Sequence, residues 1–515
     1  MLKKWSLLLL VLVLSLVISA CSEESDAGDE GEDTSESTAQ ELKIANDQEP
    51  AGLDPHKTPA HSSVRIYSKV YEGLVSLDEN MEIEGQLAES WDQPSDDTYV
   101  FNLVEGVKFH NGREMTAEDV KYSFERILDE ETASHIASYF NMVDSIEVVD
   151  DYTVQFNLSE PSASFLNNLT NASAAIVPEE LVEENDGDLQ QVAEGTGPFT
   201  FVEWVPDSKV TLEKNEDYYI EGQPKLDTVS YYTMKEEASR LSAIRTGEVD
   251  MTTVGAKSSS LLEDQENVEV IDYQSLEYSY VGFNVDKEPF NDEKVRQALS
   301  LATDRDKVTE IVWDGDAEQS GPVAPSMGEW PIDVTEEELY NRDIERAKEL
   351  LAEAGYENGF ETEITTASTY PDMVDTAQLL QQQWAEIGVD ASINQIEWGE
   401  YIDVWSNTSA DVLIGRNGSG TDPDRSLNYF FHTEGSANVW NFSNEDYDQL
   451  VEEAEMENDQ ESRKEMYVEA QEEIINLSPN LFLVSPKNYV AVNESVANYT
   501  PYAHNAEDIV EVTKE

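Results

Sequence analysis

The most specific part of this sequence is LAESWDQPSDDTYVFNLVEGVKFHNGREMTAEDV, residues 87–120. Val100 and Leu103, followed by Phe109, suit two strands of a packed sheet. Asn111-Gly112 supplies the positive φ that a tight turn needs. Residues 116–119, TAED, form a capping box, which predicts that a helix begins there. The stretch therefore predicts strands, a turn and a helix in close succession.

Two later segments repeat a helix, a glycine and a strand. Apolar residues recur at helical spacing over residues 344–354 and 374–387, and these helices are predicted to end at Gly355 and Gly388. The strand-like segments that follow them are residues 360–366 and 389–396. A helix that leads through a glycine into a strand, twice over, indicates an α/β architecture.

Two further sets of motifs lie downstream of residue 120. The second set is GTGPF at 195–199, NEDYY at 215–219 and PKLD at 224–227. The third set is FN at 283–284, PFND at 289–292, VRQAL at 295–299 and DR at 304–305. Together with residues 87–120, these motifs resemble the signatures of family 5 of the bacterial extracellular solute-binding proteins, the oligopeptide and dipeptide receptors of ABC importers. Most of them read as scaffold residues, so they indicate a fold more than a binding site.

The resemblance implies a periplasmic-binding-protein-like α/β fold, in which two lobes close on a hinge and a third domain is inserted. Lobe I would consist of residues 41–61, 194–279 and 487–515. Lobe II would be the insertion of residues 62–193, and lobe III would be residues 280–486. The hinge would be formed where the chain crosses between lobes I and III, near residues 278–283 and 482–486.

The N-terminus has the pattern of a bacterial lipoprotein leader. Residues 1–20 contain two lysines, a short apolar run and the residues ISA directly before Cys21. The run is too short to span a bilayer, so it predicts a removed signal peptide. The resemblance to lipoprotein signals implies lipidation of Cys21, with residues 21–40 as a disordered acidic tether. An ordinary secretory signal that ends at a cysteine is the alternative.

Charge limits the partners of this protein. The formal net charge of the 515-residue chain is −78, from 109 acidic and 31 basic residues. Such a field disfavours nucleic acid and other anionic partners. Because the carboxylates are spread along the chain, we interpret them as an adaptation to a saline or alkaline habitat, where ions screen their repulsion. The single cysteine excludes an internal disulfide.

Catalytic and metal-binding motifs are missing from the sequence. The six histidines include no HExxH pair, and the chain has no Walker A loop and no GxSxG elbow. We therefore predict no catalytic residue, no metal site and no cofactor. A secreted peptide hydrolase or chaperone remains the rival from another functional class.

The resemblance also implies where a ligand would bind. Residues 415–424 read GRNGSGTDPD, and in the family this loop carries an aspartate that pairs with the peptide ammonium. Aligned on Asp422, that aspartate becomes Ser419, and a pocket tryptophan becomes Arg416. The arginine that holds the ligand carboxylate in dipeptide receptors is also missing from residues 367–371. Arg416 could bind a ligand carboxylate or pair with a surface acid, and Asp422 is favoured as a turn residue.

The candidate ligand-binding residues form one set that draws on two lobes. They are Ala60, His61, Tyr370, Trp398, Arg416, Asn417, Ser419 and Asp422.

The expected protein is a monomeric, lipid-anchored receptor on the extracytoplasmic face of the cell membrane. It would capture peptides or peptide-like solutes and deliver them to the permease subunits of an ABC transporter. A receptor for glutathione or another acidic peptide-like solute is the alternative, and a nickel-chelate receptor is a weaker one.

Overall fold

The computed structural model describes residues 40–262, 264–504 and 508–514. The predicted signal peptide, Cys21 and residues 22–39 of the predicted tether lie outside the described residues. Among the described helices, none is both long and apolar enough to cross a membrane.

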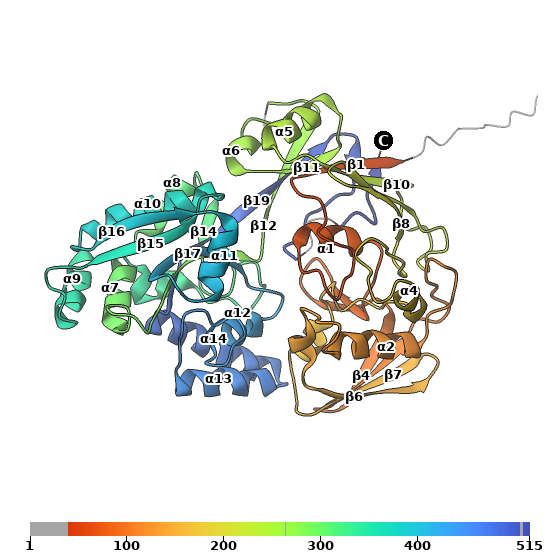
Figure 1. The fold of residues 1–515 in the computed structure, drawn as a ribbon, viewed down its shortest axis with the longest axis horizontal. Helices are drawn as coiled ribbons and strands as arrows, with labels where there is room; N and C mark the ends of the chain where they lie inside the picture. The colour runs from red at the N-terminus through yellow and green to blue at the C-terminus, as the bar shows by residue number, and fades with distance from the viewer. Residues whose placement is uncertain (1–39, 263, 505–507, 515) are drawn as a thin grey trace, which may run out of the picture. The chain divides into compact units, whose positions relative to one another are not determined.

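The largest sheet combines segments from both ends of the described chain (Figure 1). Its strand order is β12-β19-β11-β1-β10-β9-β8, and β14 pairs with β19 off this path. The strands are β1 (Glu41–Asn46), β8 (Phe199–Val205), β9 (Lys209–Lys214), β10 (Thr228–Thr233), β11 (Met251–Val254), β12 (Val268–Gln274), β14 (Ala317–Gln319) and β19 (Val484–Asn493). Strand β1 pairs parallel to β10 and β11, and the other pairs are antiparallel.

A second sheet is antiparallel, with the order β4-β5-β7-β6. Its strands are β4 (Ala88–Ser95), β5 (Thr98–Leu103), β6 (Val143–Asp150) and β7 (Thr153–Leu158). Helix α2 (Ala117–Leu128) packs on this sheet. The predicted capping box is confirmed, because the Thr116 side chain and the Asp119 carboxylate each bond the other residue's backbone N–H.

The third sheet has the order β16-β15-β17-β13-β18. Its strands are β13 (Glu277–Phe283), β15 (Glu361–Ala367), β16 (Asp390–Ile396), β17 (Val412–Gly418) and β18 (Asn480–Phe482). Strand β15 runs parallel to β16 and to β17, whereas β13 runs antiparallel to β17 and to β18. Helix α10 (Pro371–Ala385) lies along this sheet (Figure 1).

The remaining elements are the other helices and two short strand pairs. The helices are α1 (His61–Tyr67), α3 (Phe165–Asn168), α4 (Glu179–Glu184), α5 (Glu237–Thr246), α6 (Ala256–Ser259), α7 (Glu293–Ala302), α8 (Arg305–Val312), α9 (Ile344–Glu353), α11 (Trp398–Ser406), α12 (Pro423–Phe431), α13 (Glu445–Met456) and α14 (Gln460–Leu477). Short 3-10 helices are η1 (Ala137–Phe140), η2 (Val334–Glu336) and η3 (Glu338–Tyr340). Two small two-stranded sheets pair β2 (Val75–Leu77) with β3 (Ile83–Gly85) and β20 (Val496–Ala497) with β21 (Thr513–Lys514).

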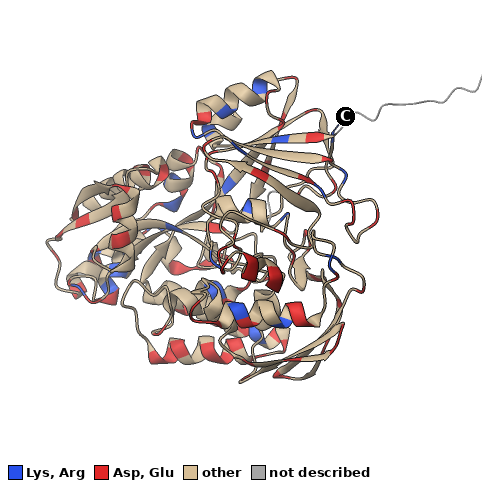
Figure 2. Ribbon diagram, turned by 45° about the vertical axis from the view of Figure 1, so that its right-hand side comes forward, with Lys and Arg blue, Asp and Glu red and all other residues tan. Residues whose placement is uncertain are grey.

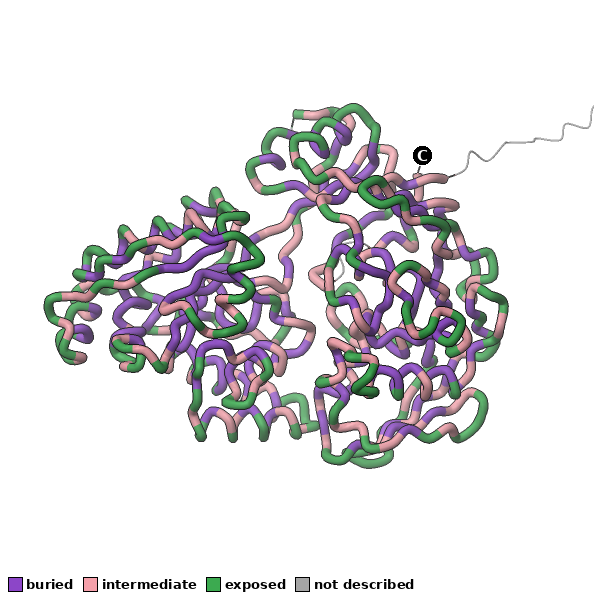
Figure 3. The backbone as a smooth tube through the Cα atoms, viewed as in Figure 1, coloured by how far each residue is buried: buried purple, intermediate pink, exposed green. Residues whose placement is uncertain are grey.

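Each of the three sheets has its own apolar core, and its central strands are mostly buried (Figure 3). The third sheet's core draws on residues 278–483, and the second sheet's core draws on residues 74–176. Tyr67 and Leu181, which the sequence assigned to the inserted domain, pack in the core of the largest sheet. The exact bounds of the three lobes stay a prediction. Acidic residues are spread over the whole described fold (Figure 2).

The first two motifs contact each other in the fold. His110 donates its backbone N–H to the Gly195 carbonyl at 2.9 Å, and its Nε2 lies 3.0 Å from the Gly197 carbonyl oxygen. A Cβ on Gly195 would lie 2.2 Å from the Val70 carbonyl oxygen, so this glycine is required by close backbone approach. Phe109 is not in a strand as predicted. It lies in a turn, where Gly112 has a φ of +88° and donates its N–H to the Phe109 carbonyl.

Candidate functional site

The parallel strands of the third sheet end at one edge, and each leads into a helix. Strand β15 ends at Ala367 before α10, β16 ends at Ile396 before α11, and β17 ends at Gly418 before α12. The register aligns Ala367 with Ile396. In open α/β sheets, ligands bind outside the carboxyl ends of the strands. This edge is therefore the place to look for a ligand site.

Three of the predicted residues meet at this edge. Tyr370 follows β15, Trp398 follows β16 and Arg416 lies near the end of β17. The ring centroids of Tyr370 and Trp398 are 5.0 Å apart at an interplanar angle of 81°, and the Arg416 guanidinium carbon lies 4.9 Å from the Tyr370 ring centroid. Trp398 also stacks on Tyr401 at 5.2 Å. We call Tyr370, Asp372, Trp398, Tyr401 and Arg416 the strand-end cluster.

Asp372 belongs to the strand-end cluster, and the sequence reasoning missed it. Its Oδ2 lies 3.7 Å from Nε of Arg416, an ion pair that is longer than a hydrogen bond. Burial raises the pKa of the Asp372 carboxyl, and the Arg416 charge acts in the opposite direction. A usable signal was present, because Asp372 follows Pro371 in the first turn of a helix that begins just beyond a strand.

Ser419 is completely buried and is hydrogen-bonded to neighbouring protein groups. Its Oγ accepts a hydrogen bond from the Ala324 N–H at 2.8 Å and lies 3.5 Å from the Pro322 carbonyl oxygen. Its backbone N–H donates to the Leu276 carbonyl at 2.7 Å. The serine thus ties the end of β17 to residues 322–324.

Asp422 and Asn417 are also engaged with neighbouring protein groups. The Asp422 carboxylate accepts the Asp424 N–H at the start of α12 and forms a buried ion pair with Arg463. Asn417 is nearly buried, and its Nδ2 lies 3.5 Å from the Tyr278 hydroxyl. These contacts agree with the structural role that the sequence favoured for Asp422.

Ala60 and His61 lie on a different core from the other six candidates. Ala60 is the N-cap of α1, and His61 is its exposed first residue. Helix α1 contributes Ile66 and Tyr67 to the core of the largest sheet. The structure thus divides the predicted set between two cores, and it stays a prediction that these residues form one site.

Two of the chain crossings between the largest and the third sheet lie close to the end of β17. One crossing joins β12 to β13, and the other joins β18 to β19. Hydrogen bonds link them, because Gln274 Nε2 donates to the Ser485 carbonyl at 2.9 Å and Ser485 Oγ donates to the Glu277 carbonyl at 2.7 Å. Glu277 is paired in register with Gly418. The two crossings therefore form a bonded pair beside the strand-end cluster.

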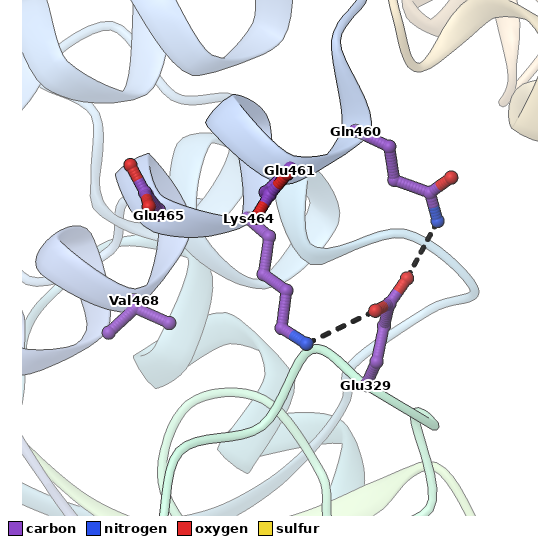
Figure 4. A pocket seen from close by; sticks show the side chains of 6 residues that line it. All are labelled: Glu329, Gln460, Glu461, Lys464, Glu465 and Val468. Carbon is purple, nitrogen blue, oxygen red and sulfur yellow. Dashed lines mark hydrogen bonds and ion pairs between the residues drawn. The ribbon is translucent and has the colours of Figure 1, made fainter.

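A separate hollow of about 710 Å³ lies along α14 (Figure 4). It is lined by Glu329, Gln460, Glu461, Lys464, Glu465 and Val468. Glu329 accepts hydrogen bonds from Lys464 at 3.1 Å and from Gln460 at 2.6 Å. Three of its polar side chains thus bind one another, and the hollow contains none of the predicted ligand residues. Among the described residues, no group of three acidic, histidine or cysteine side chains could hold a metal ion.

Comparison with known protein families identifies the family of this chain. Residues 82–438 match the model of the bacterial extracellular solute-binding proteins, family 5 Middle. The chain belongs to this family. As a family 5 solute-binding protein it is a receptor and not an enzyme, and the family places its work outside the cytoplasm.

Individual family 5 proteins are similar to this one along nearly the whole chain. The oligopeptide-binding protein AppA of Bacillus subtilis is 29% identical, over 99% of this chain and 98% of its own. A glutathione-binding protein GsiB of Pectobacterium atrosepticum is 28% identical, over 87% of this chain and 89% of its own. The solved structure of the periplasmic binding protein DppA from Helicobacter pylori, in complex with the peptide STSA, has a TM-score of 0.80 and 30% identity, covering 93% of this chain and 98% of that one. The expected periplasmic-binding-protein-like fold is confirmed.

Proposed function

We propose that this protein is the substrate-binding lipoprotein of an ABC importer. It captures peptides or peptide-like solutes in a cleft between lobes I and III and delivers them to the permease subunits of the transporter. The similarity to peptide and glutathione receptors supports the ligand class. The bonded pair of crossing strands beside the strand-end cluster supports a hinge, because closure about short crossings brings two lobes onto one ligand.

The observation that carries this proposal is the position of Arg416. It is a cation at the carboxyl end of β17, with its side chain 28% exposed and its guanidinium over the face of Tyr370. A guanidinium binds a carboxylate through two parallel hydrogen bonds, and stacking on a ring fixes its orientation. Every peptide offers at least one carboxylate, and acidic peptides offer more.

Glutathione, or another acidic peptide-like solute, is the favoured ligand within this class. At the position where the family carries its ammonium-binding aspartate, this chain has Ser419, which is buried and already hydrogen-bonded. A neutral, occupied side chain cannot offset the charge of a buried ammonium. A plain dipeptide therefore loses an anchor here, while a ligand with an extra carboxylate gains from Arg416.

Calorimetric titration of the mature protein tests the function. Glutathione, a neutral dipeptide and a neutral pentapeptide are titrated into the wild type, Arg416→Ala and Arg346→Ala. We expect glutathione to bind most tightly and Arg416→Ala to weaken it at least about tenfold. Arg346 lies on α9 and pairs with Glu349 and Glu353, so Arg346→Ala is the matched control that should bind normally. Tightest binding of the neutral dipeptide, with no effect of Arg416→Ala, would reject the proposed ligand.

Membrane attachment is tested separately, through Cys21. A lipid on Cys21 supplies anchoring energy without contacting the folded domain. Cys21→Ala should therefore release the protein from membranes in cell fractionation while leaving its melting temperature unchanged. Retention of the variant on membranes at the wild-type level would contradict lipid anchoring.

A further inference from the structure

The ion pair between Arg416 and Asp372 is incomplete, unlike the buried pair of Arg463 with Asp422. Nε of Arg416 lies 3.7 Å from Oδ2 of Asp372, whereas Arg463 makes two hydrogen bonds of 2.8 Å to Asp422. The side chains of Arg416 and Asp372 are 28% and 18% exposed. A guanidinium has five N–H donors and a carboxylate has several acceptor positions. Both charged groups are partly exposed and therefore retain donors and acceptors for a ligand.

The surroundings of Asp372 favour an additional cation. Arg416 stabilises the Asp372 carboxylate, but the acidic side chains of Glu277 and Asp375 add negative potential to the same place. Glu277 begins β13 and Asp375 lies one turn further along α10. Arg416 is thus the one cation named among three carboxylates, and it lies 3.7 Å from the nearest of them. An ammonium group brought by a ligand would restore the balance of charge.

We infer that Asp372 binds the ammonium of the ligand while Arg416 binds its carboxylate. The inference rests on the proposed function and names the chemistry that its site selects. Because the two anchors are neighbours, they suit a ligand whose ammonium and carboxylate are attached to one carbon, a free α-amino acid head. In an α-linked linear peptide, the terminal ammonium and terminal carboxylate are separated by the whole chain. A γ-linked peptide keeps both groups on its first residue.

The protein offers an apolar surface beside the charged pair for the rest of such a ligand. The Trp398 side chain is 41% exposed and packs against Tyr370 and Tyr401. An exposed aromatic ring that is held in place by two others offers a rigid surface for the ligand's remaining atoms. The charged pair therefore orients the head of the ligand, and the aromatic residues contact its other residues.

Two isomeric tripeptides test the inference. Glutathione is γ-Glu-Cys-Gly, and α-Glu-Cys-Gly has the same atoms and the same charges with the ammonium and the free carboxylate on different carbons. Both are titrated in reduced form into the wild-type mature protein. We expect glutathione to bind at least about tenfold more tightly, because a site with two adjacent charged anchors rejects a ligand that leaves one of them unpaired.

Variants of Asp372 connect this preference to the residue. Asp372→Asn should remove most of the preference by weakening glutathione at least about tenfold, with a much smaller effect on the α-linked isomer. Asp372→Glu keeps the negative charge and should restore part of the preference for glutathione. Asp390→Asn is the matched control, because Asp390 is an exposed aspartate at the start of β16, and it should behave as the wild type. Melting temperatures show that each variant is folded.

The possible results separate this inference from the proposed function. Equal or tighter binding of the α-linked isomer by the wild type would overturn the inference even if Asp372→Asn failed to fold, and would leave a peptide receptor standing. An unchanged preference in folded Asp372→Asn would overturn it as well. Failure of the wild type to bind either tripeptide, or any of the peptides above, would instead reject the proposed function.

Discussion

Arg463 holds Asp422 through two hydrogen bonds of 2.8 Å, and both side chains are more than nine-tenths buried. Arg463 comes from α14, whereas Asp422 is the N-cap of α12. Further acidic side chains lie close to this pair. Burial and the nearby Glu455 raise the pKa of Asp424 to about 8. This arrangement ties the loop between β17 and α12 to α14.

Removing one partner of this pair should therefore destabilise the protein strongly. Asp422→Asn leaves a buried guanidinium without its counter-charge, which costs about 3–5 kcal/mol in the free energy of unfolding. The control is Glu329→Gln, because Glu329 pairs with Lys464 on the same helix α14 but is about half exposed. That change should cost less than about 1 kcal/mol. Urea denaturation measures both, and equal losses would show that burial of the pair is unimportant.

The glycines of β17 should differ sharply in their tolerance of a methyl group. A Cβ on Gly415 would lie 2.3 Å from the Tyr280 hydroxyl oxygen, whereas a Cβ on Gly418 would have nothing within 4 Å. Gly415→Ala should cost about 1–3 kcal/mol, since it overpacks a buried contact. Gly418→Ala should change the free energy of unfolding by less than about 0.5 kcal/mol. Similar values for the two variants would contradict the packing of Tyr280 against β17.

His56 should make the stability of the protein depend on pH. Burial and the adjacent Arg126 lower the pKa of His56 to about 4. Its Nε2 lies 3.0 Å from the Ala175 carbonyl oxygen and its Nδ1 lies 2.7 Å from Nη1 of Arg126, so the native ring is neutral, with Nε2 donating and Nδ1 accepting. Between about pH 4 and 6.5 the unfolded state binds this proton and the native state does not. Stability is therefore lost as the pH falls through this window.

The histidine's share of that loss can be isolated by substitution. At 1.36 kcal/mol per pKa unit, His56 accounts for about 3 kcal/mol across the window. His56→Gln should be less stable at pH 7 and should lose correspondingly less on acidification. Denaturation curves at pH 7 and pH 4.5 measure this, with His61→Gln as the control because its side chain is exposed. The same pH dependence in His56→Gln and in the wild type would exclude His56 as a cause.

Salt should stabilise the folded protein. The net charge of the chain is −78, and its acidic residues are distributed over the whole described fold (Figure 2). Mutual repulsion is screened as the Debye length falls from about 30 Å at 0.01 M to about 8 Å at 0.15 M. Most of the rise in melting temperature should therefore occur below roughly 0.2 M NaCl. A melting temperature that does not rise with salt, or that rises only above 0.5 M, would contradict screening as the cause.

Several elements were predictable because their signals are local. The helices that were expected to end at Gly355 and Gly388 are α9 and α10, and both glycines have a φ of +89°. The strands expected after them are observed as β15 and β16, each shifted by one residue at its start. Apolar spacing and a residue that tolerates positive φ act within a few residues of chain, so they can be read without the fold.

The prediction that Phe109 lies in a strand was wrong, because its sequence pattern indicates burial and not a particular backbone conformation. Alternating apolar residues indicate burial, and Phe109 is indeed buried, but burial alone does not specify a strand. The hydrogen bond of its backbone N–H to the Arg113 carbonyl closes a turn, and the Arg113 guanidinium lies over its ring at 4.8 Å. Contacts of His110 with Gly195 and Gly197, far along the chain, hold this turn in place.

The sequence by itself determined the family, the α/β architecture, the positions of several helices and strands, and three of the five residues of the strand-end cluster. Tertiary structure alone decided that Asp372 pairs with Arg416, that Ser419 is buried and hydrogen-bonded, and that Asp422 forms an ion pair with Arg463. The physical reason is distance along the chain. Helices and strands form from residues that are neighbours in the sequence, whereas the partner and the burial of a polar side chain depend on which strands pair. The parallel pairing of β15 with β17 brings together residues that share no local pattern.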